Sequence, residues 1–580
     1  MDVNKVYLSQ NIKKVLSKTE EKAGYVAGWS LDSAKICAAV AGCREYFLTG
    51  LEVNGIFCIL HSILPSENEL IDICEKQCEK LEIGIENLIV IFGVKDEQKE
   101  LEITVKYYST YCSTLKDIDV ESCDPTSALL LRARGIIPCY FEVSSDEDLL
   151  RESIDQALER VKSVFQKEVA AFFLQNGEII RSSSTDQTSD DGLTIKKLLK
   201  SVQEDDTSGK SKIKKASKKK LPTEFNILIQ AGGDGIANTF NHSVVIHCQQ
   251  REFQCASVQL PIDVLIVCQE SSSTQDAYKL FLEAIGNQLS DMNNCLVKYT
   301  KISDIEAPKP YHFYLDMWDF PITVVYPAKK SDEELETYRK ELHRKLLLPM
   351  DRPFLKKLNA CDFSLASSSG HLYNPHEGIV SSGVSGGKSS IVQGTYSYHH
   401  YMQDHMDDNG WGCAYRSLQT IISWFRHQGY TDRNVPTHTE IQKALVEVGD
   451  KPESFIGSKK WIGSQEVSFC LDHLINVQSK IMFVSSGADM ANKGRELYNH
   501  FQDQGTPVMI GGGVLAHTIL GVDFNQDTGE LKFLILDPHY TGKEDLNIIL
   551  SKGWCGWKNT AFWDQTAFYN LCLPQRPKQI

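Results

Sequence analysis

Residues 408–419 read DNGWGCAYRSLQ, and this stretch decides how the last part of the chain folds. It places Cys413 directly after a Gly-Trp-Gly turn and at the start of an amphipathic pattern. The spacing of one helical face then recurs in the apolar residues Leu418, Ile421, Ile422 and Phe425. The sequence therefore predicts a helix that carries a cysteine at its N-terminus.

A cysteine at such a position is a candidate nucleophile. The positive end of the helix dipole and the unpaired backbone N–H groups favour the thiolate over the thiol, and the thiolate is the reactive form. The chain has 17 cysteines, and for most of them burial in a core is the simpler interpretation. Cys413 differs from the rest through its context.

A cysteine nucleophile needs a base, and usually a third group that orients the base. One candidate is Asp537-Pro538-His539, which follows the apolar run at residues 533–536. Because alternate residues of an extended chain point to the same face, Asp537 and His539 are expected to project together at the end of this strand. His539 would then exchange the proton, and Asp537 would orient it.

A second candidate base is His517, in the stretch GGGVLAHTILG at residues 511–521. The order Cys413, His517, Asp537 is physically reasonable as well. Spacing alone leaves the choice between His517 and His539 open.

The negative oxygen of the reaction needs hydrogen-bond donors. The backbone N–H of Cys413 is one, and a side-chain donor could come from residues 398–403, upstream of the nucleophile. His399, His400 and His405 also cluster there, but the chain contains neither H-E-x-x-H nor His-x-His. We therefore predict no metal site.

The bulk properties bound the class of protein. A chain of 580 residues implies two or three domains. Its net charge of −15 argues against nucleic-acid binding. The N-terminus carries no apolar run typical of a signal peptide, and no stretch is long and apolar enough to predict a membrane span. The cysteines are therefore expected to be reduced thiols.

Composition divides the chain into five segments. Residues 1–182 mix strand and helix patterns. Residues 183–222 are rich in Ser, Asp and Lys and are predicted to be a disordered insertion. Residues 223–366 continue the first region, and 367–389 form a Ser/Gly-rich linker. Residues 390–580 are predicted to be the catalytic domain.

Four motifs in this last segment closely resemble those of the ubiquitin-fold-modifier-specific proteases. They are the stretch at 401–417, WIGS at 461–464, GGGVLAHT at 511–518 and DPHYTG at 537–542. The resemblance covers essentially all of 390–580, and the long N-terminal extension is similar to that of the long-form (type 2) branch. It implies an α+β, papain-like cysteine peptidase domain without a cofactor.

The resemblance also implies a set of roles. The nucleophile falls on Cys413, the base on His539, the orienting acid on Asp537 and the oxyanion tyrosine on Tyr401, which leaves His517 with a structural role. Family members cleave after the C-terminal glycine of the ubiquitin-fold modifier, which matures its precursor and releases it from lysines of conjugated proteins.

For the N-terminal region the resemblance implies recruitment to an adaptor in the endoplasmic-reticulum membrane. A mixed α/β scaffold resembling inactive metalloprotease-type (MPN) modules would suit that task. The expected location is the cytoplasm, partly at the endoplasmic-reticulum surface. The lysine-rich stretch at 210–220 would also be compatible with the nucleus.

Two other functions remain as alternatives. An autophagy-modifier-processing cysteine protease shares the Trp-Gly-Cys and Asp-Pro-His signals, and a scaffold with an inactive protease fold is the non-enzymatic alternative. Selectivity for glycine would follow if bulky side chains roofed the substrate channel. Trp411 and Trp461 are the candidate walls, although burial in a core would explain both equally well.

Overall fold

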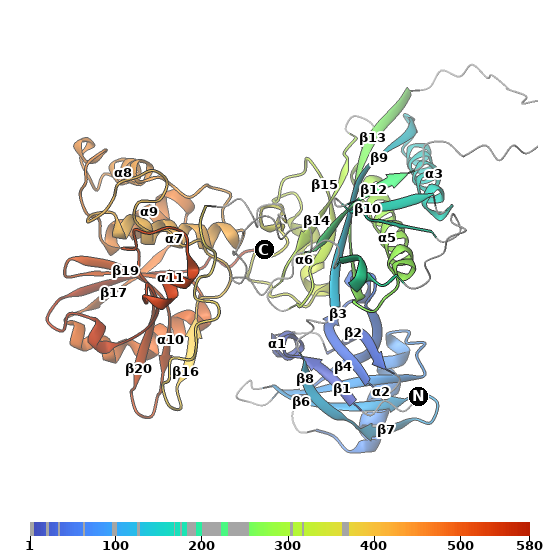
Figure 1. Cartoon of the computed structure of the whole chain (residues 1–580), viewed down its shortest axis with the longest axis horizontal. Coiled ribbons are helices and arrows are strands. Elements are labelled where there is room, and N and C mark those ends of the chain that lie inside the picture. Colours follow the sequence, from blue (N-terminus) through green and yellow to red (C-terminus); the bar gives the residue numbers. More distant parts are fainter. Residues whose placement is uncertain are drawn as a thin grey trace, which may run out of the picture. The chain divides into compact units, whose positions relative to one another are not determined.

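The computed structural model forms two compact units, one ending at Pro349 and the other beginning at Met350. Figure 1 shows both units as ribbons. The structure describes residues 5–18, 22–32, 35–61, 64–95, 101–123, 128–167, 169–174, 177–182, 193–199, 222–229, 254–301, 305–315, 318–361, 363 and 370–580.

The first unit begins with a mixed eight-stranded sheet in the order β7-β6-β5-β4-β2-β3-β1-β8. β1 runs parallel to β3 and β8, and β4 runs parallel to β5. Two helices belong to this part, α1 (Gln10–Lys18) and α2 (Glu67–Lys80). The strands are β1 (Lys5–Ser9), β2 (Ala23–Asp32), β3 (Lys35–Gly42), β4 (Glu52–His61), β5 (Asn87–Lys95), β6 (Leu101–Ser109), β7 (Thr114–Asp117) and β8 (Asp119–Cys123).

A five-stranded sheet in the order β11-β10-β12-β9-β13 forms the second half of this unit. Its helices pack on the strands and on one another, and together they enclose one hydrophobic core. A hairpin and a short helix complete the unit. The elements are β9 (Ala128–Val143), α3 (Glu147–Gln166), β10 (Ala170–Leu174), β11 (Ile179–Arg181), β12 (Thr223–Ile229), β13 (Gln254–Gln269), α5 (Thr274–Tyr299), β14 (Pro308–Phe313), β15 (Ile322–Pro327) and α6 (Glu336–Lys345).

The second unit is built on an antiparallel sheet in the order β17-β22-β18-β19-β20-β21, with β16 paired to β19. Its strands are β16 (Lys388–Ile391), β17 (Ser479–Val484), β18 (Val508–Gly512), β19 (Leu515–Phe524), β20 (Leu531–Leu536), β21 (Cys555–Asn559) and β22 (Tyr569–Pro574). Its helices are α7 (Cys413–His427), α8 (His438–Glu447), α9 (Ser464–Ile475), α10 (Gly494–Asp503) and α11 (Leu546–Ser551).

Side chains that alternate along the strands of this sheet enter two separate cores. Met509 belongs to the core that contains α7, α8 and α9, whereas its neighbours Val508 and Ile510 belong to the core that contains α10. This alternation is the period of two expected for a sheet buried on both faces. The layers are therefore helices, sheet and helix (Figure 1), and the predicted α+β class of this part is confirmed.

The structure groups some residues differently from the composition. β12 lies between β10 and β9, so the segments 1–182 and 223–366 share one sheet. Within the predicted insertion, Ile195 and Leu198 are buried in the core of the first unit, while 183–192 and 200–221 lie outside the described residues. The second unit begins at Met350, before the predicted linker. The likeness of the first unit to MPN modules stays a prediction.

In the described part of the chain, no helix has both the length and the apolar character needed to cross a bilayer.

Candidate active site

Cys413 is the first residue of α7, with Gly412 at the N-cap. The backbone oxygen of Asp408 accepts hydrogen bonds from the N–H groups of Trp411 (3.1 Å) and Gly412 (2.9 Å). A Cβ atom on Gly412 would lie 2.6 Å from the Cβ of Asp408, so this close turn requires glycine. The prediction that Cys413 begins a helix is confirmed.

His539 and Asp537 lie in a turn directly after β20. The imidazole Nδ1 of His539 is 2.6 Å from Oδ1 of Asp537, and the backbone N–H of His539 donates to the same oxygen at 3.0 Å. The two side chains meet as predicted, but through a turn instead of an extended strand end. The reason is local, because the aspartate carboxylate binds the backbone N–H two residues further on.

The charges favour an ion pair between Cys413 and His539. Burial raises the pKa of the Cys413 thiol, but hydrogen bonding to His539, the charge of His539 and a hydrogen bond to Tyr401 outweigh it, and the pKa is lowered. Burial lowers the pKa of His539, but its bonds to Asp537 and Cys413 raise it to about 9. Both shifts favour thiolate and imidazolium near neutral pH.

The Nε2 atom of His539 is the ring nitrogen opposite the one bound by Asp537. It is buried, and it has no acceptor within strict hydrogen-bond geometry among the described residues. The Cys413 thiol is nevertheless a neighbour of this ring, because its hydrogen bonding and its charge both raise the pKa of His539.

Tyr401 joins the loop before α7 to the turn that carries His539. Its backbone N–H donates to the Pro538 oxygen at 2.9 Å, and its ring stands edge-on to the His539 ring with centroids 5.3 Å apart. Burial and the neighbouring Cys413 charge raise the pKa of the Tyr401 phenol. Tyr401 therefore stays a neutral donor next to the thiol.

His517, on β19, approaches Asp537. Its Nε2 lies 3.8 Å from Oδ2 of Asp537, and its ring packs on the rings of His539 and Phe562, each with centroids 5.1 Å away. Burial lowers the pKa of His517 to about 4, so this imidazole is neutral at pH 7. His517 therefore lies next to the carboxylate of Asp537. The hydrogen bond between His539 and the Cys413 thiol favours His539 as the base.

The two candidate channel tryptophans lie in different environments. Trp411 is buried and packs edge-on against Tyr415 and His438, with ring centroids 5.4 Å apart in both cases. Trp461 is 55% exposed, and its Nε1 donates to the Gly410 oxygen at 3.2 Å. Of the two, only Trp461 presents a large surface beside the loop that precedes Cys413.

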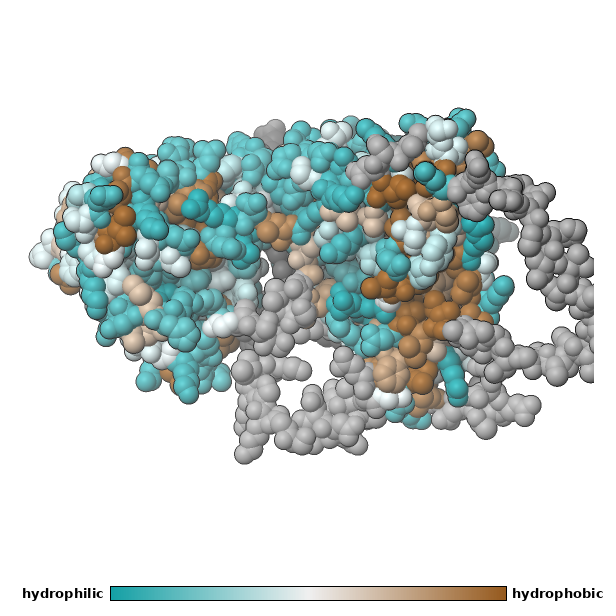
Figure 2. Space-filling view, turned by 90° about the horizontal axis from the view of Figure 1, so that it is seen from above, coloured by the Kyte–Doolittle hydropathy of each residue, from teal (hydrophilic) through white to brown (hydrophobic). Residues whose placement is uncertain are grey.

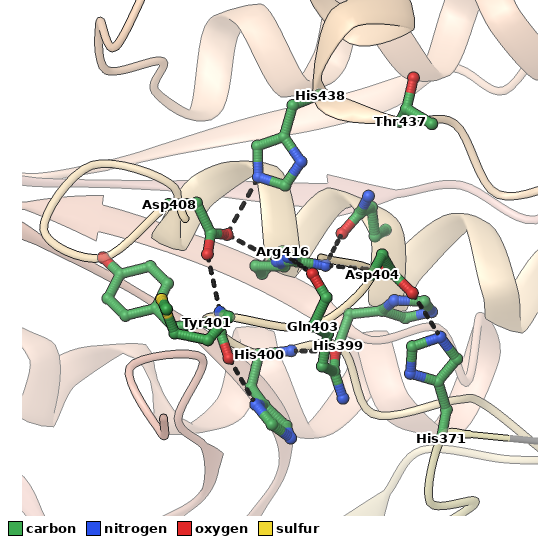
Figure 3. A network of polar contacts seen from close by, with 12 residues as sticks. His371, His399, His400, Tyr401, Gln403, Asp404, Asp408, Arg416, Thr437 and His438 are labelled. Atoms are coloured by element: carbon green, nitrogen blue, oxygen red, sulfur yellow. Dashed lines mark hydrogen bonds and ion pairs between the residues drawn. The ribbon is translucent and has the colours of Figure 1, made fainter. Parts of the chain in front are cut away.

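Sequence reasoning missed a buried polar network beneath this loop, drawn in Figure 3. Asp408 and Arg416 are fully buried, and Nε of Arg416 is 2.6 Å from Oδ2 of Asp408. The same oxygen lies 3.0 Å from Nε2 of His438, and Oδ1 of Asp408 accepts the backbone N–H of Met402 at 2.9 Å. The sequence offered one signal for this network, a charged Arg416 within the predicted helix. On α7 both Arg416 and the residues around it are buried.

Two groups of described side chains also have the spacing of metal ligands. One is His517, Asp537 and His539 of the site itself, and the other is His371, His399 and Asp404.

A thiol at a helix N-terminus, an aspartate-bound histidine beside it and an α+β fold define a papain-like cysteine peptidase. The family model of Peptidase family C78 matches residues 387–572, and that of the N-terminal region of Ufm1-specific protease 2 matches 155–367. The chain belongs to the Ufm1-specific protease 2 family.

The relatives that support this assignment match over most of the chain. The Ufm1-specific protease 2 of Rattus norvegicus is 46% identical over 463 residues, which are 78% of this chain and 100% of the relative. The Homo sapiens protein of the same name is 44% identical over 78% of this chain and 98% of its own length. The crystal structure of UfSP from C. elegans superposes with a TM-score of 0.67 at 28% identity and covers 100% of both chains.

Proposed function

We propose that this chain is a thiol protease that cleaves after the C-terminal glycine of the ubiquitin-fold modifier Ufm1. The cleavage would mature the Ufm1 precursor and release Ufm1 from lysine side chains of conjugated proteins. The observation that carries the proposal is the grouping of Cys413, His539 and Asp537 in a chain whose relatives are named Ufm1-specific protease 2.

The site residues divide the chemistry between them. The Cys413 thiolate attacks the carbonyl carbon of the scissile bond, and the His539 imidazolium then protonates the leaving amine. Asp537 orients the imidazole and stabilises its charge. The backbone N–H of Cys413 and the Tyr401 hydroxyl would donate to the oxyanion. Water, deprotonated by His539, then hydrolyses the thioester.

Selectivity for glycine can be argued from Trp461. Its indole is fixed to the Gly410 oxygen, beside the turn that leads to Cys413, and half of its surface is free. A bulky wall there admits most easily a chain without a Cβ before the scissile bond. Trp411 contributes to this wall through packing beneath the same loop.

The test is cleavage of a C-terminal extension from Ufm1 by the full chain, with Cys413→Ser as the control. Release of the extension after the C-terminal glycine by the wild type alone supports the proposal. Cleavage of an autophagy modifier in place of Ufm1 would assign the chain to the alternative substrate. Failure to cut either modifier, together with retained binding, would favour an inactive scaffold.

The first unit is proposed to recruit the enzyme to an adaptor at the endoplasmic-reticulum membrane. The rest of the protein population would be in the cytoplasm, and the nucleus is proposed as a further compartment. Support comes from exposed apolar side chains on the same face of β9 and β12, namely Ile136, Tyr140 and Leu228. Figure 2 shows brown patches on this unit, the right-hand body in that view. Replacing Ile136 and Tyr140 by Ser and then imaging the tagged chain in cells tests the proposal, since loss of the reticular fraction is expected.

A further inference from the structure

Three side chains with metal-ligand chemistry meet on the far side of Arg416 from Asp408. They are His371, His399 and Asp404, and their ligand atoms all lie within 4.8 Å of one another. Nε2 of His371 is 3.3 Å from Oδ1 of Asp404, and the two imidazole rings have centroids 4.4 Å apart. Figure 3 shows the His399 ring directed toward the other two side chains.

His399 is the unusual member of this group. It is only 4% exposed, and neither of its ring nitrogens has a hydrogen-bond partner in the described part of the chain. Buried imidazole nitrogens are ordinarily hydrogen-bonded, because a buried polar group without a partner is costly. The orphaned nitrogens of His399 therefore indicate a ligand that completes the group.

The loop that presents Asp404 is strained in a way that would suit a ligand. Met402, Asp404 and His405 all have positive φ angles, of 64°, 56° and 56°. Each such residue costs free energy unless its surroundings hold it in place. A ligand bound by Asp404 would offset part of that cost.

We propose that His371, His399 and Asp404 form a binding site for a divalent transition-metal ion such as Zn²⁺. Imidazole and carboxylate are ligands that Zn²⁺ accepts, with a water in the fourth position. Tetrahedral ligands about 2.1 Å from zinc lie about 3.4 Å apart. Because all ligand atoms already lie within 4.8 Å of one another, the widest pair has to close by at most about 1.4 Å through rotation of the rings.

The charges around the site agree with a cation. Oδ2 of Asp404 binds Nη1 of Arg416 at 2.8 Å, which leaves Oδ1 toward the histidines. The carboxylates of Asp404 and Asp408 carry two negative charges, and Arg416 between them carries one positive charge.

The metal would act on the nucleophile helix through Asp404. Arg416 lies one turn beyond Cys413 on α7, and its Nη2 also donates to the Gln403 oxygen at 2.8 Å. Fixing Asp404 therefore fixes both the loop that carries Tyr401 and the first turn of α7. The site is a structural clamp on the catalytic loop.

The experiment measures zinc binding by the full chain in a Cys413→Ala/His539→Ala background, which removes the ligands of the active site itself. His371→Asn and His399→Asn are compared with this background after equilibration in buffered Zn²⁺, removal of free metal and metal analysis. The melting temperature with and without Zn²⁺ is the second readout. His405→Asn, in the same loop and exposed, is the matched control.

The background and the His405→Asn control are expected to retain one more equivalent of zinc than either site variant. In either site variant the zinc affinity should fall by more than about 10- to 100-fold, the range for loss of a group that only hydrogen-bonds to a metal ligand. The zinc-induced rise in melting temperature should also disappear. Equal zinc content and equal thermal shifts in His371→Asn and the background would overturn the proposal. If His399→Asn fails to fold, His371→Asn decides alone, because that side chain is partly exposed.

Discussion

At the scale of single residues, Cys413 differs from the other buried cysteines of its unit in what surrounds the sulfur. Burial raises the pKa of Cys470 and of Cys572 to about 12, which keeps both thiols protonated and unreactive. Burial acts in the same direction on Cys413, but His539 and Tyr401 reverse the result. The chemistry of the site thus depends on the neighbours of the thiol more than on the thiol itself.

Alkylation measures this difference. At pH 7, iodoacetamide should modify Cys413 at least about 100-fold faster than Cys470 or Cys572, because the pKa of Cys413 is lowered whereas theirs are raised to about 12. In His539→Ala the pKa of Cys413 should rise and its rate should fall. Peptide mass spectrometry reads each site separately. Equal rates at Cys413 in the wild type and His539→Ala would contradict the ion pair.

The same pair predicts the alkaline limit of activity. The imidazolium of His539 is present below its pKa of about 9 and is lost as the pH rises through that value. Cleavage measured as kcat/KM should therefore decline above about pH 9. In Asp537→Asn the stabilising carboxylate is gone, so the decline should move to lower pH. An unchanged alkaline limit in this variant would show that another group sets it.

The choice between the two histidines is tested by substitution. His539→Ala should lower kcat by about 10²- to 10⁴-fold, the range for loss of a general acid–base group. His517→Gln should cost far less, because Asp537 keeps its 2.6 Å contact with His539. Kinetics on a Ufm1 fusion compare the two. An inactive His517→Gln beside an active His539→Ala would reverse the assignment.

At the scale of elements, the start of α7 could be predicted because its signals are local. Gly412, the position of Cys413 and the helical period all lie within one short stretch. The network beneath it could not be predicted, since His438 meets Asp408 across 30 positions in sequence. Nor could spacing choose between His517 and His539, because the turn at Pro538 that aims His539 forms against Tyr401.

Removing Arg416 should destabilise the second unit. Arg416→Gln leaves the fully buried Asp408 without its 2.6 Å partner, and breaking a buried pair costs about 3–5 kcal/mol. Tryptophan fluorescence in urea should show a lower unfolding midpoint. Arg495→Gln is the control, because Arg495 is exposed on α10 and should change stability by no more than about 0.5 kcal/mol. Equal midpoints for both variants would mean that Arg416 is not an anchor.

At the scale of the whole molecule, the chain has two units with their own cores, and composition placed the boundary between them too late in the sequence. Glycine and serine at 367–389 are typical of linkers, but part of this segment is bound to the second unit. The Ser382 hydroxyl donates to Oδ2 of Asp523 at 2.6 Å, and the Ser385 oxygen accepts from Asn525 at 2.7 Å. Composition cannot reveal such bonds, because their partners are distant in sequence.

The last prediction is that residues 350–580 form the smallest stable catalytic fragment. Asp351 belongs to it, since its carboxylate accepts from Nη2 of Arg576 at 2.9 Å and Leu355 is fully buried. A fragment of residues 390–580 cuts through β16 and leaves the buried Asp523 without Ser382. Unpaired buried groups cost about 1–3 kcal/mol each, so this shorter fragment should melt lower and lose activity.

Thermal unfolding and Ufm1-fusion cleavage of both fragments, against the full chain, measure the difference. The fragment 350–580 should keep kcat/KM within about twofold of the full chain, because every side chain assigned to the chemistry lies on its own elements. The variant Ser382→Ala in 350–580 separates the bond to Asp523 from the loss of the whole segment, and should account for about 1–3 kcal/mol. Equal melting temperatures for the two fragments would place the start of the catalytic domain at residue 390. They would also show that the hydrogen bonds made by residues 350–389 do not contribute to its stability.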